Sequence, residues 1–228
     1  MGLSSWFRDL GVPWKISIGI LGGVAAVTSA YGLYTFYIHQ EDRKQRSSNG
    51  ETAGETSEKK VLVLGLEGAG KSTFLAALAQ HDSPITSERE GTKPTEGFHV
   101  VCVSTKGISL NIWEIGGKFK SYWPNFFTDV SVLVYVIDSS ASERFDESKD
   151  ALSKVLSDEN LKGIPLVLLA TKQDAAGTKS SQDVASFFGL EALSSSRKTE
   201  IAAVEILATG EVRGLQDAKE LILNFCTQ

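Results

Sequence analysis

Apolar and polar stretches alternate along the chain from residue 59 onward, in an order typical of an α/β domain. Short apolar runs that predict strands lie at 60–66, 98–104, 109–115, 130–138, 164–170 and 201–208. Stretches that predict helices lie between and after them, at 71–80, 120–128, 142–156, 180–189 and 214–226. This order predicts a mostly parallel six-stranded sheet with helices on both faces. Because the runs 98–104 and 109–115 are separated by only a few residues, we expect them to form an antiparallel hairpin.

The first 58 residues have a different pattern. Residues 16–38 carry no charged side chain, and as a helix they would span about 34 Å, which exceeds a hydrocarbon core of about 30 Å. We therefore expect an N-terminal flank at 1–15, a transmembrane helix at 16–38 and a flexible polar linker at 39–58. The weaker alternatives are an interfacial amphipathic helix and a signal peptide cleaved near the small residues 28–30.

The predicted span also sets the expected location. Slightly more Lys and Arg residues follow 16–38 than precede it, which predicts a single-pass membrane protein whose C-terminal domain faces the cytosol. The endoplasmic reticulum and the mitochondrial outer membrane are not distinguished by this pattern. Gly19 and Gly23 are four residues apart, a spacing that would allow weak self-association of two such helices in the lipid bilayer.

Charge and cysteine content exclude several classes of protein. The formal net charge is −5, which argues against a nucleic-acid-binding surface. Cys102 and Cys226 are the only cysteines, and their spacing does not match a structural zinc site. This usage fits a reducing compartment.

The most specific motif follows the first predicted strand. Residues 65–72 read Gly-Leu-Glu-Gly-Ala-Gly-Lys-Ser, a complete P-loop between a strand and a helix. Its glycines let the backbone approach phosphates closely, and its N–H groups would form an anion nest at a helix N-terminus. Lys71 would contact the β- and γ-phosphates, and the Ser72 hydroxyl would bind Mg²⁺. The predicted phosphate-binding residues are Gly65, Glu67, Gly68, Ala69, Gly70, Lys71, Ser72 and Thr73.

Two later motifs predict metal and γ-phosphate contacts. Thr95 lies in a loop ahead of the strand at 98–104, where its hydroxyl could bind Mg²⁺ while its N–H meets the γ-phosphate. Glu114 lies near the end of the next strand and could reach the metal through water. Gly117 offers a backbone N–H to the γ-phosphate with no side chain in the way. The ordinary alternatives are a Pro-Thr turn and a strand that ends in a Gly-Gly turn.

A third motif predicts the base. Thr171, Lys172 and Asp174 follow the strand at 164–170. A carboxylate at Asp174 could accept both N–H groups on the Watson–Crick edge of guanine, whereas adenine presents no such pair of donors. Lys172 could lie along the base and ribose, and Ala208 and Thr209 could bring a backbone N–H to the guanine oxygen. The predicted ligands are therefore GTP or GDP, with Mg²⁺.

These motifs, in this order and spacing, resemble the Arf-like branch of the small GTPases. The resemblance covers 59–228, and the runs 114–117 and 216–219 resemble one member of that branch in particular. It implies two switch loops that are ordered by the γ-phosphate, with Ser72 and Thr95 at the metal. It also implies that an effector and an exchange factor contact an aromatic cluster of Phe98, Trp113 and Phe126. The alternative is that these three side chains simply belong to the core.

The chain departs from the family pattern where hydrolysis is catalysed. Lys118 stands at the position of the family's water-orienting glutamine, next to Gly117. The stretch 116–130 contains neither Gln nor His and is two residues shorter than the usual pattern. A lysine ammonium has donors only and cannot accept a hydrogen bond from the attacking water. We therefore expect nucleotide binding with very slow hydrolysis. Glu114 also replaces the family's Asp, and Thr171 its commoner Asn.

The leading interpretation is a membrane-anchored Arf-like GTP-binding protein that acts as a nucleotide-dependent switch with weak or absent intrinsic hydrolysis. One alternative is a constitutively GTP-bound scaffold without turnover. Another is a membrane GTPase similar to the β subunit of the signal-recognition-particle receptor, which also joins a membrane helix to an Arf-like domain. A P-loop kinase or ATPase is disfavoured by Asp174.

Overall fold

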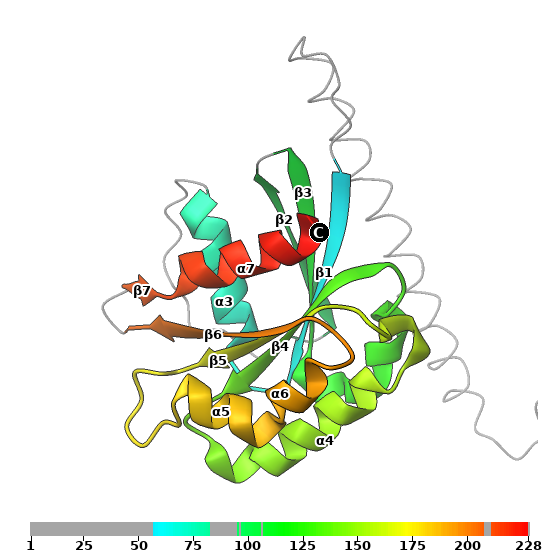
Figure 1. Ribbon diagram of the computed structural model, residues 1–228. Helices are drawn as coiled ribbons and strands as arrows, with labels where there is room; N and C mark the ends of the chain where they lie inside the picture. The colour runs from blue at the N-terminus through cyan, green and yellow to red at the C-terminus, as the bar shows by residue number, and fades with distance from the viewer. Residues whose placement is uncertain (1–56, 83–94, 96, 106, 208–210, 228) are drawn as a thin grey trace, which may run out of the picture. The chain divides into compact units, whose positions relative to one another are not determined.

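The computed structural model describes residues 57–82, 95, 97–105, 107–207 and 211–227, which form a sheet covered by helices (Figure 1). The strands are β1 (Ser57–Gly65), β2 (Phe98–Thr105), β3 (Ile108–Ile115), β4 (Val130–Asp138), β5 (Leu166–Thr171), β6 (Thr199–Ile206) and β7 (Val212–Arg213). Their order in the sheet is β2-β3-β1-β4-β5-β6-β7. The pairs β2–β3 and β6–β7 are antiparallel, and the other neighbours are parallel.

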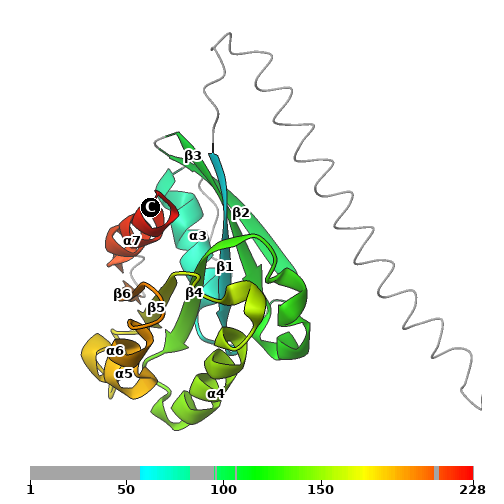
Figure 2. The same ribbon diagram turned by 45° about the vertical axis from the view of Figure 1, so that its right-hand side comes forward.

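The helices cover both faces of this sheet. The α-helices are α3 (Lys71–Asp82), α4 (Phe145–Leu156), α5 (Ser181–Phe188), α6 (Leu190–Leu193) and α7 (Leu215–Thr227). The short 3₁₀ helices are η1 (Gly117–Phe126), η2 (Ser142–Arg144) and η3 (Glu159–Leu161). Helices α3 and α7 lie together on one face, while α4 and α5 lie on the other (Figures 1 and 2).

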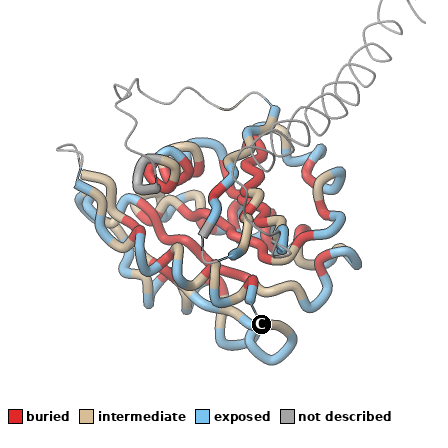
Figure 3. Tube along the Cα trace, turned by 90° about the horizontal axis from the view of Figure 1, so that it is seen from above, coloured by how far each residue is buried: buried red, intermediate tan, exposed pale blue. Residues whose placement is uncertain are grey.

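The three central strands form the core. Val61–Leu64 of β1, Val132–Ile137 of β4 and Leu166–Ala170 of β5 are apolar and buried throughout. Figure 3 shows buried segments running through the interior of the structure. A strand that is covered on both faces needs apolar side chains at every position, so these runs do not alternate. Because β1, β4 and β5 are parallel neighbours, their carboxyl ends lie side by side at one edge of the sheet.

The structure confirms the predicted hairpin, since β2 and β3 pair from Phe98 with Ile115 to Thr105 with Ile108. The predicted helix at 120–128 is instead the 3₁₀ helix η1, which begins at Gly117 and has non-helical dihedrals at Phe119. Pro124 lies inside η1, and because proline has no N–H it disfavours a continuous α-helix there.

Two parts of the predicted fold class are corrected. The sheet has seven strands and not six, because the two-residue strand β7 pairs with the end of β6. A two-residue strand is too short to show any period in a sequence. The predicted preceding transmembrane helix is not supported either. The longest described helix, α7, has 13 residues and is therefore about 20 Å long.

The predicted single-pass membrane location is not supported either, because it depended on that helix. Within the ranges that the structure describes, no helix has the length and apolar character needed to cross a membrane. The segment 16–38, on which the prediction was based, lies outside those ranges, as do Gly19, Gly23, the flank at 1–15 and most of the linker at 39–58. The supported fold class is an α/β P-loop domain with a mixed seven-stranded sheet.

Candidate functional site

The loop between β1 and α3 is shaped by close contacts of its glycine backbone. Gly65 has a φ of 150°, and a Cβ there would lie 2.3 Å from the Val136 carbonyl oxygen on the neighbouring strand. Gly70 has a φ of 90°, which side chains with a Cβ rarely adopt. Helix α3 then begins at once, as the Phe74 N–H donates to the Gly70 carbonyl at 2.9 Å. The first-turn N–H groups of α3 therefore face the loop.

Lys71, the first residue of α3, is buried and extends its amine back into this loop. Its Nζ donates to the carbonyl oxygens of Gly65 at 3.0 Å and Leu66 at 2.9 Å. Burial lowers the pKa of Lys71 to about 8, although the negative charges of Glu114 and Glu67 partly oppose that shift. The loop thus holds a desolvated amine whose charged form gains from any anion placed against it.

Three oxygen-bearing side chains from distant segments meet beside Lys71. The Ser72 Oγ lies 3.0 Å from the Thr95 Oγ1, and both hydroxyls donate to the Glu114 Oε1, at 2.5 Å and 3.0 Å. Glu114 is only 1% exposed. Its second oxygen, Oε2, has no hydrogen-bond partner among the described residues, and the Nδ1 of His99 is 3.9 Å away.

This oxygen cluster fits Mg²⁺. An orphaned buried carboxylate oxygen is unfavourable unless a cation or donor compensates it. Hydroxyl and carboxylate oxygens are the ligands that Mg²⁺ takes from proteins, with water and phosphate completing its shell. No group of three or more His, Cys, Asp and Glu residues suited to a metal occurs in the described part of the chain, so a site made mainly of His and Cys ligands finds no support there.

Gly116 packs directly against the backbone at Thr95, and Gly117 packs directly against the backbone of the P-loop. A Cβ at Gly116 would lie 2.3 Å from the Thr95 carbonyl oxygen, and one at Gly117 would lie 2.3 Å from the Glu67 nitrogen. The Trp123 indole donates to the Gly116 carbonyl at 3.2 Å, which anchors the start of η1. Lys118, which follows Gly117 in the chain, is exposed.

The segment after β5 contacts the same loop. The Thr171 hydroxyl lies within hydrogen-bond distance of the Ala69 carbonyl at 2.7 Å and the Ile137 carbonyl at 3.0 Å. Thr171 therefore joins β5 to the P-loop and does not face outward as a ligand contact. Asp174 is exposed, in a turn where the Ala175 N–H donates to the Lys172 carbonyl at 3.1 Å.

Lys172 makes an ion pair that sequence reasoning missed. Its Nζ lies 2.6 Å from the Asp138 Oδ2. Burial alone would raise the pKa of Asp138, but hydrogen bonds from Lys172 and Ser140 outweigh it and hold that pKa below its usual value. The sequence feature that could have predicted this pair is the position of Asp138 at the end of β4, at the same edge of the sheet as Lys172. Arg144, whose Nη1 donates to the Glu67 carbonyl at 3.0 Å, was missed as well and had no sequence signal.

The order of the strands brings the predicted phosphate and base segments to one edge. β1, β4 and β5 are parallel neighbours, so the loops after Gly65 and Thr171 lie two strands apart, about 10 Å. That spacing suits the two ends of one nucleotide. Ala208 and Thr209, the other predicted base contacts, lie outside the described residues.

The predicted aromatic cluster is assembled on β2, β3 and η1. The ring centroids of Phe98 and Trp113 are 5.6 Å apart and stacked, and Phe126 lies 5.6 Å from Phe98 and 6.2 Å from Trp113. Trp113 is buried, whereas Phe98 and Phe126 are partly exposed. Because η1 begins at Gly117, a movement of that glycine would also move this cluster.

Comparison with known proteins gives the family. The ADP-ribosylation factor family matches residues 46–225. The chain is 41% identical over 138 residues to ADP-ribosylation factor-like protein 3 of Chlamydomonas reinhardtii, covering 60% of this chain and 75% of that one. It is 34% identical over 164 residues to ADP-ribosylation factor-like protein 1 of Saccharomyces cerevisiae, covering 71% and 86%.

The fold also agrees with a solved structure. The Arl6 BBS3 small GTPase of Trypanosoma brucei, with the bound nucleotide analogue GppNp, superposes with a TM-score of 0.63 at 22% identity. The match covers 75% of this chain and 98% of that one. With the family match, the resemblance drawn from the motifs is confirmed at the level of the family. The chain belongs to the ADP-ribosylation factor family and is an Arf-like small GTPase, a nucleotide-dependent switch.

Proposed function

We propose that this chain binds GTP and GDP with Mg²⁺ at the edge formed by β1, β4 and β5, and that it hydrolyses GTP weakly or not at all. The observation that carries the proposal is the convergence of Ser72, Thr95 and Glu114 beside the buried Lys71. These residues come from three separate segments, and no purely structural need explains a buried carboxylate oxygen without a partner.

The phosphates would be held by the P-loop. Lys71 would exchange its two carbonyl partners for phosphate oxygens, and the backbone N–H groups of the loop would complete an anion nest. The Gly117 N–H would meet the γ-phosphate. The proposed nucleotide contacts are Gly65, Glu67, Gly68, Ala69, Gly70, Lys71, Ser72, Thr73, Thr95, Gly117, Lys172, Asp174, Ala208 and Thr209, with Thr171 supporting the loop.

The metal would be held by the oxygen cluster. Ser72 and Thr95 would bind it through their hydroxyls, and Glu114 through water. When bound, Mg²⁺ neutralises charge on the phosphates. Thr95 then links the metal to the segment before β2, so loss of the γ-phosphate would release that segment.

Guanine specificity is tested by replacing Asp174 with Asn. The purified full chain should bind GTP and GDP in a competition assay, and ATP should not compete. The Asn amide can accept only one of the two hydrogen bonds and turns an N–H toward the other guanine donor. This change would weaken GDP binding by about 3 kcal/mol, or roughly 150-fold. Lys162→Met, at an exposed residue away from this edge, is the control and should bind GDP like the wild type.

The same variant also tests whether a loss reflects recognition and not misfolding. An Asn amide can donate to the C2 carbonyl of xanthine, so Asp174→Asn should gain affinity for xanthosine diphosphate. Equal competition by ATP and GTP in the wild type would refute the base assignment. Unchanged GDP affinity in Asp174→Asn would refute it as well.

Slow hydrolysis is proposed from Lys118. This residue is exposed beside Gly117, and its ammonium cannot accept a hydrogen bond from an attacking water. The same observation favours the second candidate function, a scaffold that remains loaded with GTP and does not turn over. A multiple-turnover assay with the full chain separates the two, because only a switch would release phosphate repeatedly.

Replacing Lys118 with Gln should therefore speed hydrolysis. A glutamine can both accept from and donate to the attacking water, and we expect single-turnover GTP cleavage to rise by about tenfold or more. Lys118→Met removes the charge without adding an acceptor and should remain as slow as the wild type. If both variants cleave GTP equally, the missing acceptor is not the cause of slow turnover.

An effector and an exchange factor are proposed to contact the cluster of Phe98, Trp113 and Phe126, because it connects the two segments that flank the γ-phosphate site. Within the family, we also infer that the chain is most similar to ADP-ribosylation factor-like protein 9. That inference comes from the runs Glu114–Gly117 and Gln216–Lys219.

A further inference from the structure

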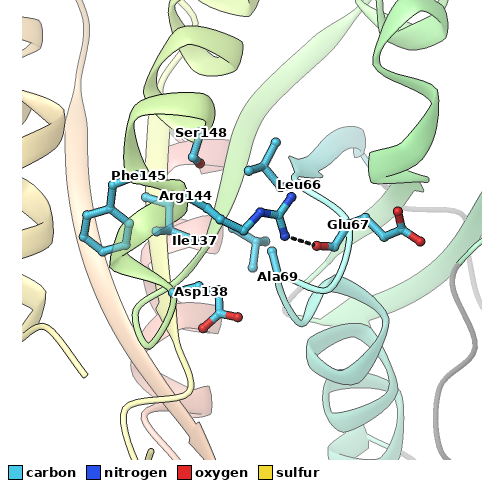
Figure 4. A pocket seen from close by; sticks show the side chains of 10 residues that line it. Leu66, Glu67, Ala69, Ile137, Asp138, Arg144, Phe145 and Ser148 are labelled. Carbon is cyan, nitrogen blue, oxygen red and sulfur yellow. Dashed lines mark hydrogen bonds between the residues drawn. The ribbon is translucent and has the colours of Figure 1, made fainter. Parts of the chain in front are cut away.

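Arg144 joins the P-loop to helix α4 at the end of η2. Its Nη1 donates to the Glu67 carbonyl at 3.0 Å, and its guanidinium points directly at that oxygen (Figure 4). Its Nε and Nη2 both donate to the Glu147 Oε2, at 3.3 Å and 3.2 Å. The other oxygen, Oε1, accepts from the Lys120 Nζ at 2.7 Å. Lys120 belongs to η1, so this chain of contacts runs from η1 to the P-loop.

The contact with Glu67 fixes a phosphate-binding group. A trans peptide is planar, so the carbonyl of Glu67 and the N–H of Gly68 point in opposite directions. A carbonyl held toward Arg144 therefore directs the Gly68 N–H away from α4. Gly68 has a φ of 78°, and the space around its missing Cβ is open. Because a glycine in open space restrains its own backbone weakly, the hydrogen bond from Arg144 supplies the restraint.

The other end of the chain of contacts depends on η1. Lys120 lies three residues after Gly117, in the segment that the proposed function makes responsive to the γ-phosphate. Hydrogen bonds from Lys120 and Arg144 lower the pKa of Glu147, so its carboxylate stays charged and available to both. A displacement of η1 would withdraw Lys120 and leave Glu147 free to turn away from Arg144.

We propose that Lys120, Glu147 and Arg144 form an ion-pair relay that couples the position of η1 to the orientation of the Glu67–Gly68 peptide, and thereby sets the rate of nucleotide release. Arg144 is a positioning residue, since it acts through the backbone of the P-loop. The relay rests on the proposed function of nucleotide binding. Its three side chains are each more than 40% exposed, so its effect is modest and weakens with salt.

The relay is tested by release of a fluorescent, non-hydrolysable GTP analogue from the full chain at low ionic strength, because the γ-phosphate is what holds η1 in place. Arg144→Met, Glu147→Gln and Lys120→Met should each release the analogue roughly three- to tenfold faster than the wild type. In a Glu147→Gln background, Lys120→Met should add nothing, because the contact it removes is already lost. The control is Lys162→Met, which breaks an exposed pair with Glu159 (3.7 Å) and should release at the wild-type rate.

The unfolding midpoint of the nucleotide-free chain is measured for every variant. Faster release at an unchanged midpoint supports the relay, while faster release with a matching loss of stability shows a structural role and overturns it. The relay is also overturned if Lys120→Met speeds release by the same factor in the wild type and in the Glu147→Gln background. Wild-type binding with unchanged release in all variants refutes the relay alone. Absence of any guanine-nucleotide binding by the wild type refutes the proposed function, and the relay with it.

Discussion

Replacing Lys71 with Met is expected to weaken GDP binding by about 2–5 kcal/mol, or roughly 30- to 5,000-fold, without destabilising the nucleotide-free fold. Lys71 is almost fully buried, and its hydrogen-bond partners among the described residues are two backbone carbonyls. Burial lowers the pKa of Lys71, so burial disfavours its charged form and a nearby anion would favour it. A methionine keeps most of the apolar stem and removes the charge, a change that is often neutral for stability when the ion is poorly paired.

Isothermal titration calorimetry with GDP measures the expected loss of affinity. Unfolding of the nucleotide-free chain by urea measures whether its stability is unchanged. Lys60→Met is the matched control, because Lys60 is also a partly buried lysine that donates to a carbonyl, that of Thr128 at 2.8 Å. Burial likewise lowers the pKa of Lys60. Its loss should leave GDP affinity unchanged. Equal loss of affinity in both variants would show that general stability, and not the phosphate contact, is what Lys71 provides.

The central sheet was predictable because its pattern is local. Val61–Leu64 and Leu166–Ala170 are continuous apolar runs of strand length, and buried parallel strands require such runs. The oxygen cluster was predictable for a different reason. Ser72, Thr95 and Glu114 each lie two residues from a glycine, in short motifs that assign them a specific contact.

The missed residues lack any such local signal. The pairing of Arg144 with the Glu67 carbonyl depends on how α4 packs beside the P-loop, and that packing is set by apolar side chains elsewhere in the fold. The pairing of Lys172 with Asp138 likewise depends on two strands becoming neighbours. Thr171 was predicted as part of the base motif, and only its tertiary contact with the Ala69 carbonyl shows that it supports the loop.

The two glycines after Glu114 illustrate how a motif gains meaning from packing. In the sequence they are compatible with an ordinary turn. In the structure a Cβ at Gly117 would lie 2.3 Å from the Glu67 nitrogen and 2.6 Å from the Gly65 carbonyl oxygen. Both atoms belong to the backbone of the P-loop, so they cannot move aside as a flexible side chain would. The absence of a side chain is therefore what allows the start of η1 to lie against the phosphate site.

Replacing Gly117 with Ala should consequently reduce the preference for GTP over GDP. Overpacking of this kind raises the free energy by about 1–3 kcal/mol, which would lower GTP affinity by roughly 5- to 150-fold. GDP affinity should change little, because GDP has no γ-phosphate for the Gly117 N–H to meet. The ratio of the two dissociation constants, measured by competition in the presence of Mg²⁺, checks this expectation.

Gly163→Ala is the control that separates a change in the GTP-to-GDP affinity ratio from a general loss of stability. Gly163 has a φ of 72° and open space around its missing Cβ, so alanine there adds backbone strain of about 1–2 kcal/mol without a clash. This variant should lose stability and keep the wild-type ratio of GTP to GDP affinity. Gly117→Ala should show the reverse, because the start of η1 can shift away from the P-loop while the sheet beneath it is unchanged. A wild-type ratio in Gly117→Ala would mean that η1 need not approach the P-loop to distinguish the two nucleotides.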